Sequence, residues 1–160
     1  MAYIIDGNNV MGQTPGWHRD KPKACRNLLE EVAAFARAGK TRITVVFDGA
    51  PNAAIPDGSA FRGVKVVYAD RGSDADSKIV RIVESSSDPK GLTVVTSDRH
   101  LAFIVHSRGA TVLRSGDFRR KMGEALLHAP APKPEQEPAG QNTDEWLRYF
   151  GFLPGDADVG

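Results

Sequence analysis

The chain has 160 residues, of which 41% are hydrophobic and 26% are charged, and its formal net charge is +1. This length and balance are typical of a soluble globular protein with one domain of ordinary size and a tail. The longest apolar run is far too short to span a membrane and no signal-peptide pattern opens the chain, so we expect a cytoplasmic protein without a membrane partner. The single cysteine, Cys25, excludes an internal disulfide and a cysteine-based zinc site.

The charge is unevenly distributed along the sequence. Segment 129–160 holds two basic and six acidic residues, which leaves 19 basic and 14 acidic residues in segment 1–128. The larger segment is therefore near +5. Such a charge suits a polyanionic partner, and on charge alone an ordinary solvated surface explains it equally well.

Apolar runs and amphipathic stretches alternate through most of the chain. The apolar runs predict buried strands, and stretches with helical apolar spacing predict helices between them. Segment 49–62, which contains glycine, proline and asparagine, is predicted to be a long loop. The predicted elements, in chain order, are strand Tyr3–Ile5, helix Lys21–Ala38, strand Arg42–Phe47, strand Val64–Tyr68, helix Asp74–Ser85, strand Leu92–Thr96, helix Arg99–Ser107, strand Thr111–Leu113 and helix Asp117–Leu127.

This alternation predicts an α/β fold with a central, mostly parallel sheet of about five strands and helices on both faces. The domain is expected to cover residues 1–128. Segment 129–142 is rich in proline and nearly free of apolar residues, so it is predicted to be a linker. Segment 143–160 begins with a short aromatic, amphipathic stretch, which either packs back on the domain or docks on a partner.

Aspartates follow the apolar runs at several points. Asp6 and Asp48 end two predicted strands, Asp98 follows a third, and Asp74 and Asp76 lie at a predicted helix start. The carboxyl ends of parallel strands share one edge of the sheet, where open α/β sheets bind their ligands. Crowded carboxylates favour a hard cation such as Mg²⁺ or Mn²⁺. Any one of these aspartates has about even odds of being only a cap or turn residue, but their shared location predicts a metal site for phosphate-ester chemistry.

Two other phosphate chemistries fit the sequence poorly. The nearest approach to a P-loop is Gly39-Lys40-Thr41, but the first glycine of that motif would be Ala34, inside a predicted helix. An aspartyl-phosphate phosphatase of the haloacid dehalogenase type needs a second aspartate two residues after the first, and Asn8 stands there. The four histidines show neither triad nor metal-ligand spacing.

Four short segments contain the aspartates together with characteristic neighbours. They are Ile5-Asp6-Gly7-Asn8-Asn9-Val10, Val45-Val46-Phe47-Asp48, Ala75-Asp76-Ser77-Lys78-Ile79 and Val94-Val95-Thr96-Ser97-Asp98-Arg99. Together these segments resemble the NYN domain family, a branch of the PIN-like nucleases, and most closely its YacP-like members. The resemblance covers about residues 1–127 and implies a PIN-like three-layer sandwich. It also implies an endoribonuclease that depends on Mg²⁺ or Mn²⁺.

By position in these motifs, the resemblance implies that Asp6, Asp76 and Asp98 hold the metal and that Asn9 and Asp48 assist them. Three further candidates are Asn8, Asp74 and Ser97. Relatives often carry another residue at the position of Asn8. Asp74 lies beside Asp76, and the sequence leaves open which of these two binds metal. Phosphate contacts are expected from the basic residues near the same edge, which are Arg71, Lys78, Arg81 and Arg99.

The leading hypothesis from the sequence is therefore a metal-dependent endoribonuclease that cleaves RNA with an activated water. The alternative is a non-catalytic RNA- or ribosome-binding adaptor with the same fold, and intact carboxylates argue against it because they repel RNA. A DNA flap nuclease is a third hypothesis, weakened because the extra clamp regions of such enzymes are missing. The translation machinery is a further candidate partner, through the C-terminal segment. The sequence assigns no oligomeric state.

Overall fold

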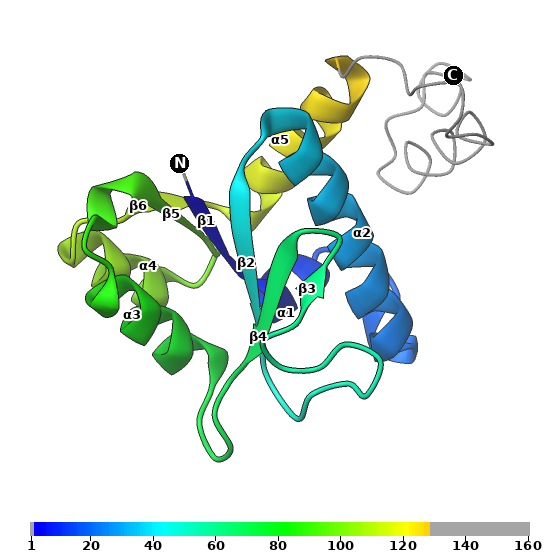
Figure 1. Cartoon of the computed structure of the whole chain (residues 1–160), viewed down its shortest axis with the longest axis horizontal. Coiled ribbons are helices and arrows are strands. Elements are labelled where there is room, and N and C mark those ends of the chain that lie inside the picture. Colours follow the sequence, from blue (N-terminus) through cyan, green and yellow to red (C-terminus); the bar gives the residue numbers. More distant parts are fainter. Residues whose placement is uncertain (1, 129–160) are drawn as a thin grey trace.

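A computed structural model describes residues 2–128, and this part of the chain forms three layers with a sheet in the middle (Figure 1). The sheet has six strands in the order β3-β4-β2-β1-β5-β6, all parallel except β3, which pairs antiparallel with β4. The strands are β1 (Ala2–Asp6), β2 (Arg42–Phe47), β3 (Ala60–Phe61), β4 (Val64–Tyr68), β5 (Leu92–Val95) and β6 (Thr111–Leu113).

Helices cover both faces of the sheet, as the sequence predicts. One apolar cluster packs α1, α2 and α5 against one face, and a second packs α3 and α4 against the other (Figure 1). The helices are α1 (Gly7–Met11), α2 (Lys21–Gly39), α3 (Ala75–Ser85), α4 (Arg99–Ser107) and α5 (Ser115–His128), with short 3-10 turns η1 (Trp17–Arg19) and η2 (Pro89–Gly91). The α/β class and the three layers are confirmed.

Two elements differ from the sequence prediction. The loop expected over residues 49–62 contains the short strand β3, which adds a sixth strand to the sheet. The stretch between Asp6 and Lys21, for which the sequence predicts no helix or strand, begins with the single-turn helix α1. Both are too short to leave a periodic apolar pattern. Asp20 caps α2, since its carboxylate accepts a hydrogen bond from the backbone N–H of Lys23.

Gly7 allows α1 to lie against the sheet. A Cβ atom at this position would come within 2.6 Å of the Phe47 ring and 3.0 Å of Val45 Cγ1. Real Cβ atoms do not approach other atoms so closely, so only glycine fits here without movement of β2. This close approach fixes the backbone between Asp6 and the two asparagines that follow it.

The predicted linker 129–142 and the C-terminal segment 143–160 lie outside the described residues. Within residues 2–128, no helix combines the length and apolar character needed to cross a membrane.

One carboxylate is buried between helices rather than at the sheet edge. Glu31 of α2 is 2% exposed, and neither of its side-chain oxygens has a hydrogen-bond partner. The Arg119 guanidinium of α5 lies 3.8 Å away and donates instead to the Thr14 hydroxyl. Burial therefore raises the pKa of Glu31 to about 8, against the weaker attraction of Arg119.

Candidate active site at the carboxyl edge of the sheet

The strand ends bring the predicted carboxylates to one region. Asp6 is the last residue of β1, which lies between β2 and β5 in the middle of the sheet. Asp48 follows β2, Asp98 precedes α4, and Asp76 is in the first turn of α3. The chain order reverses at β1, because β2 lies on one side of it and β5 on the other. Such a switch point is where open α/β folds bind ligands.

Asp6 is the most buried of these carboxylates, with 5% of its surface exposed. Its Oδ2 accepts a hydrogen bond of 2.9 Å from the Thr96 hydroxyl. Loss of solvent raises the pKa of Asp6 to about 6; the Thr96 bond opposes this rise, and the charges of Asp76 and Asp48 add to it. A cation beside Asp6 would stabilise its ionised form, which burial disfavours.

Asp76 and Asp98 lie close enough to affect each other. The pKa of Asp76 is raised, first by its partial burial and next by the charge of Asp98, with smaller effects from Asp74 and Asp48. Asp98 is held in place because its Oδ1 accepts hydrogen bonds from the backbone N–H groups of residues 100 and 101 at the start of α4. The region is thus a field of like charges that attracts a cation.

The structure separates the roles of the acidic pair at the start of α3. Asp74 is exposed and is the N-cap, because its Oδ1 accepts a hydrogen bond of 2.8 Å from the backbone N–H of Ser77. This bond lowers the pKa of Asp74. Asp76 is instead partly buried and shares its electrostatic surroundings with Asp6 and Asp98. Of the pair, Asp76 is the one that the geometry associates with the other carboxylates.

Asn8 joins the ends of two strands. Its Oδ1 accepts a hydrogen bond of 2.8 Å from the backbone N–H of Asp48, across 40 residues of sequence. Asp48 Oδ1 in turn accepts one of 2.6 Å from the backbone N–H of Ala75, at the start of α3. Asn8 therefore fixes the position of Asp48 and, through it, the first turn of α3.

Asn9 makes the equivalent connection on the other side of β1. Its Oδ1 accepts hydrogen bonds from the backbone N–H of Ser97, at 2.9 Å, and from the Ser115 hydroxyl, at 2.6 Å. Ser97 Oγ accepts a further bond from the backbone N–H of Ser115. These contacts place Asn9 and Ser97 in the frame that supports the segment before Asp98.

Two supporting residues were not predicted as site residues. Thr96 is fully buried; its hydroxyl donates to Asp6 and accepts from the backbone N–H of Asp98, so it connects two of the carboxylates. Ser115, also fully buried, follows β6 and contacts Asn9. The available signal was a hydroxyl residue just after the apolar runs of β5 and β6, next to or near residues already predicted for the site.

The basic residues predicted to contact RNA divide into two groups. Lys78 and Arg81 of α3 both form ion pairs with Asp70, at 3.3 and 2.7 Å. Arg71 is exposed beside Asp70, and Arg99 is exposed beside Asp98. The first two charges are therefore partly compensated by a neighbouring carboxylate, whereas Arg71 and Arg99 have no ion-pair partner within residues 2–128.

The donor set suits Mg²⁺ or Mn²⁺ because it consists of oxygen ligands only. Among the described residues, however, no three Asp, Glu, His or Cys side chains converge closely enough to hold a metal ion as they stand. Asp48 and Asp98 each accept hydrogen bonds from backbone N–H groups. A carboxylate has about four lone-pair positions, so these bonds leave capacity for a further ligand.

Comparisons with known proteins agree with this fold. The family model described as the YacP-like NYN domain matches residues 3–146. The crystal structure of Rae1 (YacP) from Bacillus subtilis is similar, with a TM-score of 0.66 and 21% identity over 100% of this chain and 98% of that chain. A point mutant of the same protein gives a TM-score of 0.66 and 18% identity over 99% of this chain and 98% of that one. At this identity the likeness shows the fold alone.

A search of curated protein sequences finds no match. The family model nevertheless covers most of the chain and includes all of the strands, the carboxylates at their ends and the helices between them. The chain belongs to the YacP-like NYN domain family.

Proposed function

We propose that this protein is a metal-dependent endoribonuclease that hydrolyses RNA phosphodiester bonds with water. Membership of the NYN family supports a nuclease-like function related to RNA. The observation that carries the finer proposal is the buried Asp6, whose pKa is raised to about 6 at the switch point of the sheet, with the charges of Asp48 and Asp76 beside it. Perturbed carboxylates in such a place are typical of catalytic sites.

In this proposal Asp6, Asp76 and Asp98 hold Mg²⁺ or Mn²⁺. When bound, such an ion makes a water nucleophilic near neutral pH and stabilises the leaving oxygen. Asp48, whose Oδ1 is fixed by the N–H of Ala75, orients the attacking water through its carboxylate. Asn9 is a positioning residue that holds the segment before Asp98.

In this proposal the phosphate contacts come from exposed cations without an ion-pair partner within residues 2–128. Arg99 adjoins Asp98 at the start of α4 and is suited to bind a non-bridging phosphate oxygen. Arg71 adjoins Asp70 and can contact the strand beyond the scissile bond. Lys78 and Arg81 act there only if RNA displaces them from Asp70. The proposed nuclease unit is segment 1–128.

Cleavage assays test the proposal. Mixed RNAs and DNAs of matched sequence are incubated with the full chain in Mn²⁺, in Mg²⁺ and in chelator, beside Asp6→Asn and Asp98→Asn. Asparagine keeps a carbonyl that can accept the bonds from Thr96 and from the start of α4, so both variants should fold. We expect metal-dependent cuts in RNA that disappear in both variants, and cuts that survive both substitutions would refute the proposed site.

A second candidate function is a non-catalytic RNA-binding adaptor. One observation favours it: within residues 2–128, no three potential ligands converge as they stand. The same assay separates the two functions, because an adaptor binds RNA in chelator and leaves it uncut in every metal. Calorimetric titration with Mn²⁺ adds an independent measurement, since an adaptor needs no ion at the carboxylates.

A further inference from the structure

The sheet face that carries α3 and α4 is only half covered. On β2, the side chains that alternate onto this face change from buried Val46 to partly exposed Thr44 and then to exposed Arg42. On β4, buried Val67 is followed in the same way by exposed Lys65. The helices therefore shield the carboxyl halves of these strands and leave the amino halves open.

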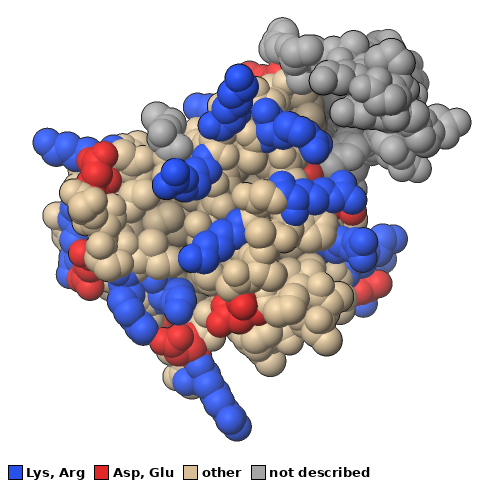
Figure 2. All heavy atoms as spheres, in the orientation of Figure 1, with Lys and Arg blue, Asp and Glu red and all other residues tan. Residues whose placement is uncertain are grey.

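The open half of the face is basic. Lys40 and Arg42 stand at the start of β2, and Lys65 lies beside Thr44 in the strand register. Within residues 2–128, none of these three cations has an ion-pair partner, in contrast to Lys78 and Arg81. Basic side chains spread over this face of the molecule (Figure 2). We call Lys40, Arg42 and Lys65 the basic strip.

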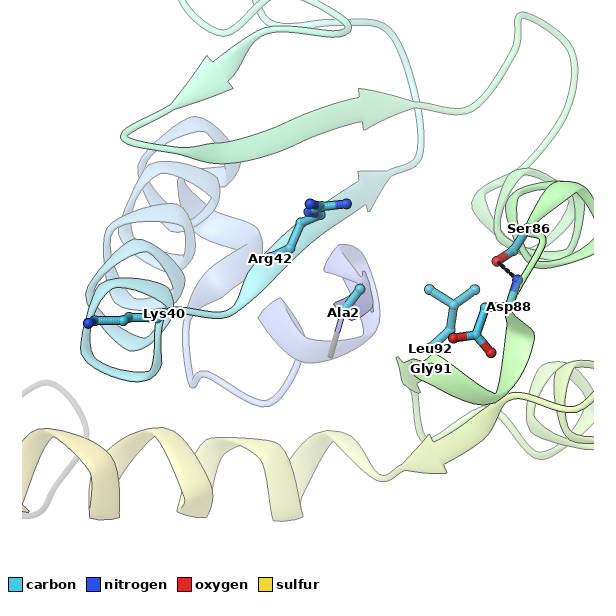
Figure 3. A pocket seen from close by; sticks show the side chains of 7 residues that line it. All are labelled: Ala2, Lys40, Arg42, Ser86, Asp88, Gly91 and Leu92. Atoms are coloured by element: carbon cyan, nitrogen blue, oxygen red, sulfur yellow. Dashed lines mark hydrogen bonds between the residues drawn. The ribbon is translucent and has the colours of Figure 1, made fainter.

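A cavity of about 430 Å³ adjoins the basic strip. Ala2 and Arg42 line it from the sheet and Lys40 from the turn before β2, while Leu92 and residues between α3 and β5 line its other side (Figure 3). That side carries the Ser86 hydroxyl and the Asp88 carboxylate, and because the carboxylate repels a phosphate, the phosphate-binding side of the cavity is the basic one. The Ser86 hydroxyl accepts a bond from the backbone N–H of Asp88 and keeps its own proton for a ligand.

The basic strip and the carboxylates share elements of the fold. Arg42 begins β2 and Asp48 follows its end, so the two are about 20 Å apart along an extended strand. Helix α3 runs between the same two regions, with Asp76 in its first turn and Ser86 just past its last. A ligand that is bound at the carboxylates and is long enough to follow α3 would reach the basic strip.

We propose that the basic strip binds the phosphate backbone of the RNA substrate, a few nucleotides away from the bond that is cut. This inference rests on the proposed function. RNA is the occupant that fits, because its charge repeats along the strand and can pair both with Arg42 and with Lys65, whose backbones are about 8 Å apart by register. With a cation at the carboxylates, short RNAs bind there alone, and longer ones gain the basic strip.

Binding of labelled single-stranded RNA tests this with Ca²⁺ in place of Mn²⁺, so that a cation is available at the carboxylates, and a gel verifies that the RNA stays uncut. The full chain is compared with the double variant Arg42→Gln/Lys65→Gln and with a control of equal charge change, Lys23→Gln/Arg37→Gln, on exposed positions of α2 at the opposite face. The probes have four and twenty nucleotides, and thermal unfolding verifies that each variant is folded.

For the twenty-nucleotide RNA, the strip variant loses two phosphate contacts, so the slope of log affinity against log salt should be shallower by about 1.4. Near 0.1 M salt this corresponds to about 25-fold weaker binding than that of the wild type. The four-nucleotide RNA should bind all proteins equally, and the control should match the wild type. Equal losses in strip and control variants, or no loss in either, would overturn the inference. Equally strong competition by poly-glutamate would also overturn it, and would indicate an acidic protein as the occupant.

Cleavage of the same RNAs in Mn²⁺ keeps this inference separate from the proposed function. If the wild type cleaves RNA and the strip variant cleaves the long RNA equally well, the proposed role of the basic strip is wrong and the proposed nuclease function stands. Strip-dependent binding without any cleavage would support the basic strip and refute the nuclease. A raised KM for the long RNA alone, with kcat unchanged, would support both.

Discussion

Replacement of Glu31 by glutamine should stabilise the protein, although it removes a charge 3.8 Å from Arg119. Glu31 is 2% exposed and has no hydrogen-bond partner on either oxygen, so the folded protein favours its protonated form. Its pKa rises from 4.5 in the reference state to about 8. Since the folded state holds this proton more tightly than the unfolded chain, stability is lost as the pH rises from 4.5 toward 8.

The magnitude follows from that difference. Each pH unit between the two pKa values costs ~1.4 kcal/mol, so the penalty relative to a neutral side chain is about 1 kcal/mol at pH 5 and about 3 kcal/mol at pH 7. Glutamine has the same shape and does not titrate. We therefore expect Glu31→Gln to be more stable than the wild type by about these amounts, with the gain growing as the pH rises.

Urea unfolding of both proteins at pH 5, 6, 7 and 8 measures this gain. The matched control is Glu30→Gln, because that side chain is 31% exposed and pairs only with Arg26 on the surface. Its effect should stay below about 1 kcal/mol at every pH. A Glu31→Gln variant that is less stable than the wild type at pH 7, or whose gain does not change with pH, would refute the reasoning.

Three other predictions concern the candidate site. Gly7→Ala should lower the free energy of unfolding, measured in urea, by about 1–3 kcal/mol, because its Cβ would meet the Phe47 ring at 2.6 Å. The control Gly116→Ala, in open space on α5, should be neutral or stabilising. Equal effects of the two substitutions would contradict the packing argument. Mn²⁺ binding should release about one proton at pH 5 and almost none at pH 7.5, because the pKa of Asp6 is about 6. Calorimetry in buffers of different ionisation enthalpy measures the number of protons released. Proton release that is unchanged in Asp6→Asn would exclude Asp6 as the source of the proton. Asn9→Ala should lower kcat more than RNA affinity, because it leaves the N–H of Ser97 without its acceptor. Amide hydrogen exchange in the segment before Asp98 should become faster in the same variant. Unchanged exchange would contradict a positioning role for Asn9.

The parts of the fold that were predictable from the sequence are those with a long apolar pattern. Runs such as Arg42–Phe47 contain enough residues to identify a buried strand, and Asp20 and Gly39 mark the ends of α2. The helix α1 and the strand β3 could not be predicted in this way, because their formation depends on packing against distant residues. Gly7, for example, is required because the ring of Phe47, 40 residues further along the chain, leaves no room for a Cβ atom at the start of α1.

The candidate site was predictable in its composition and less so in its geometry. The aspartates at strand ends follow from the pattern, since parallel strands share one edge. The partners of Asn8 and the role of Thr96 depend on strand order, which places β1 between β2 and β5 and is not written in any local segment. The distinction between Asp74 and Asp76 is similar, because both are good residues for a helix start and only the packing of α3 turns Asp76 toward the other carboxylates.

The most direct test of the central claim uses that pair. Asp74→Asn and Asp76→Asn remove the same charge two residues apart on the same helix, and asparagine at position 74 can still cap α3. We would measure Mn²⁺-dependent cleavage of a single-stranded RNA by both variants and the wild type. The account predicts that Asp74→Asn cuts at close to the wild-type rate and that Asp76→Asn loses cleavage at least 100-fold, about 2.7 kcal/mol of transition-state stabilisation. Equal activity in the two variants, or loss only in Asp74→Asn, would contradict it.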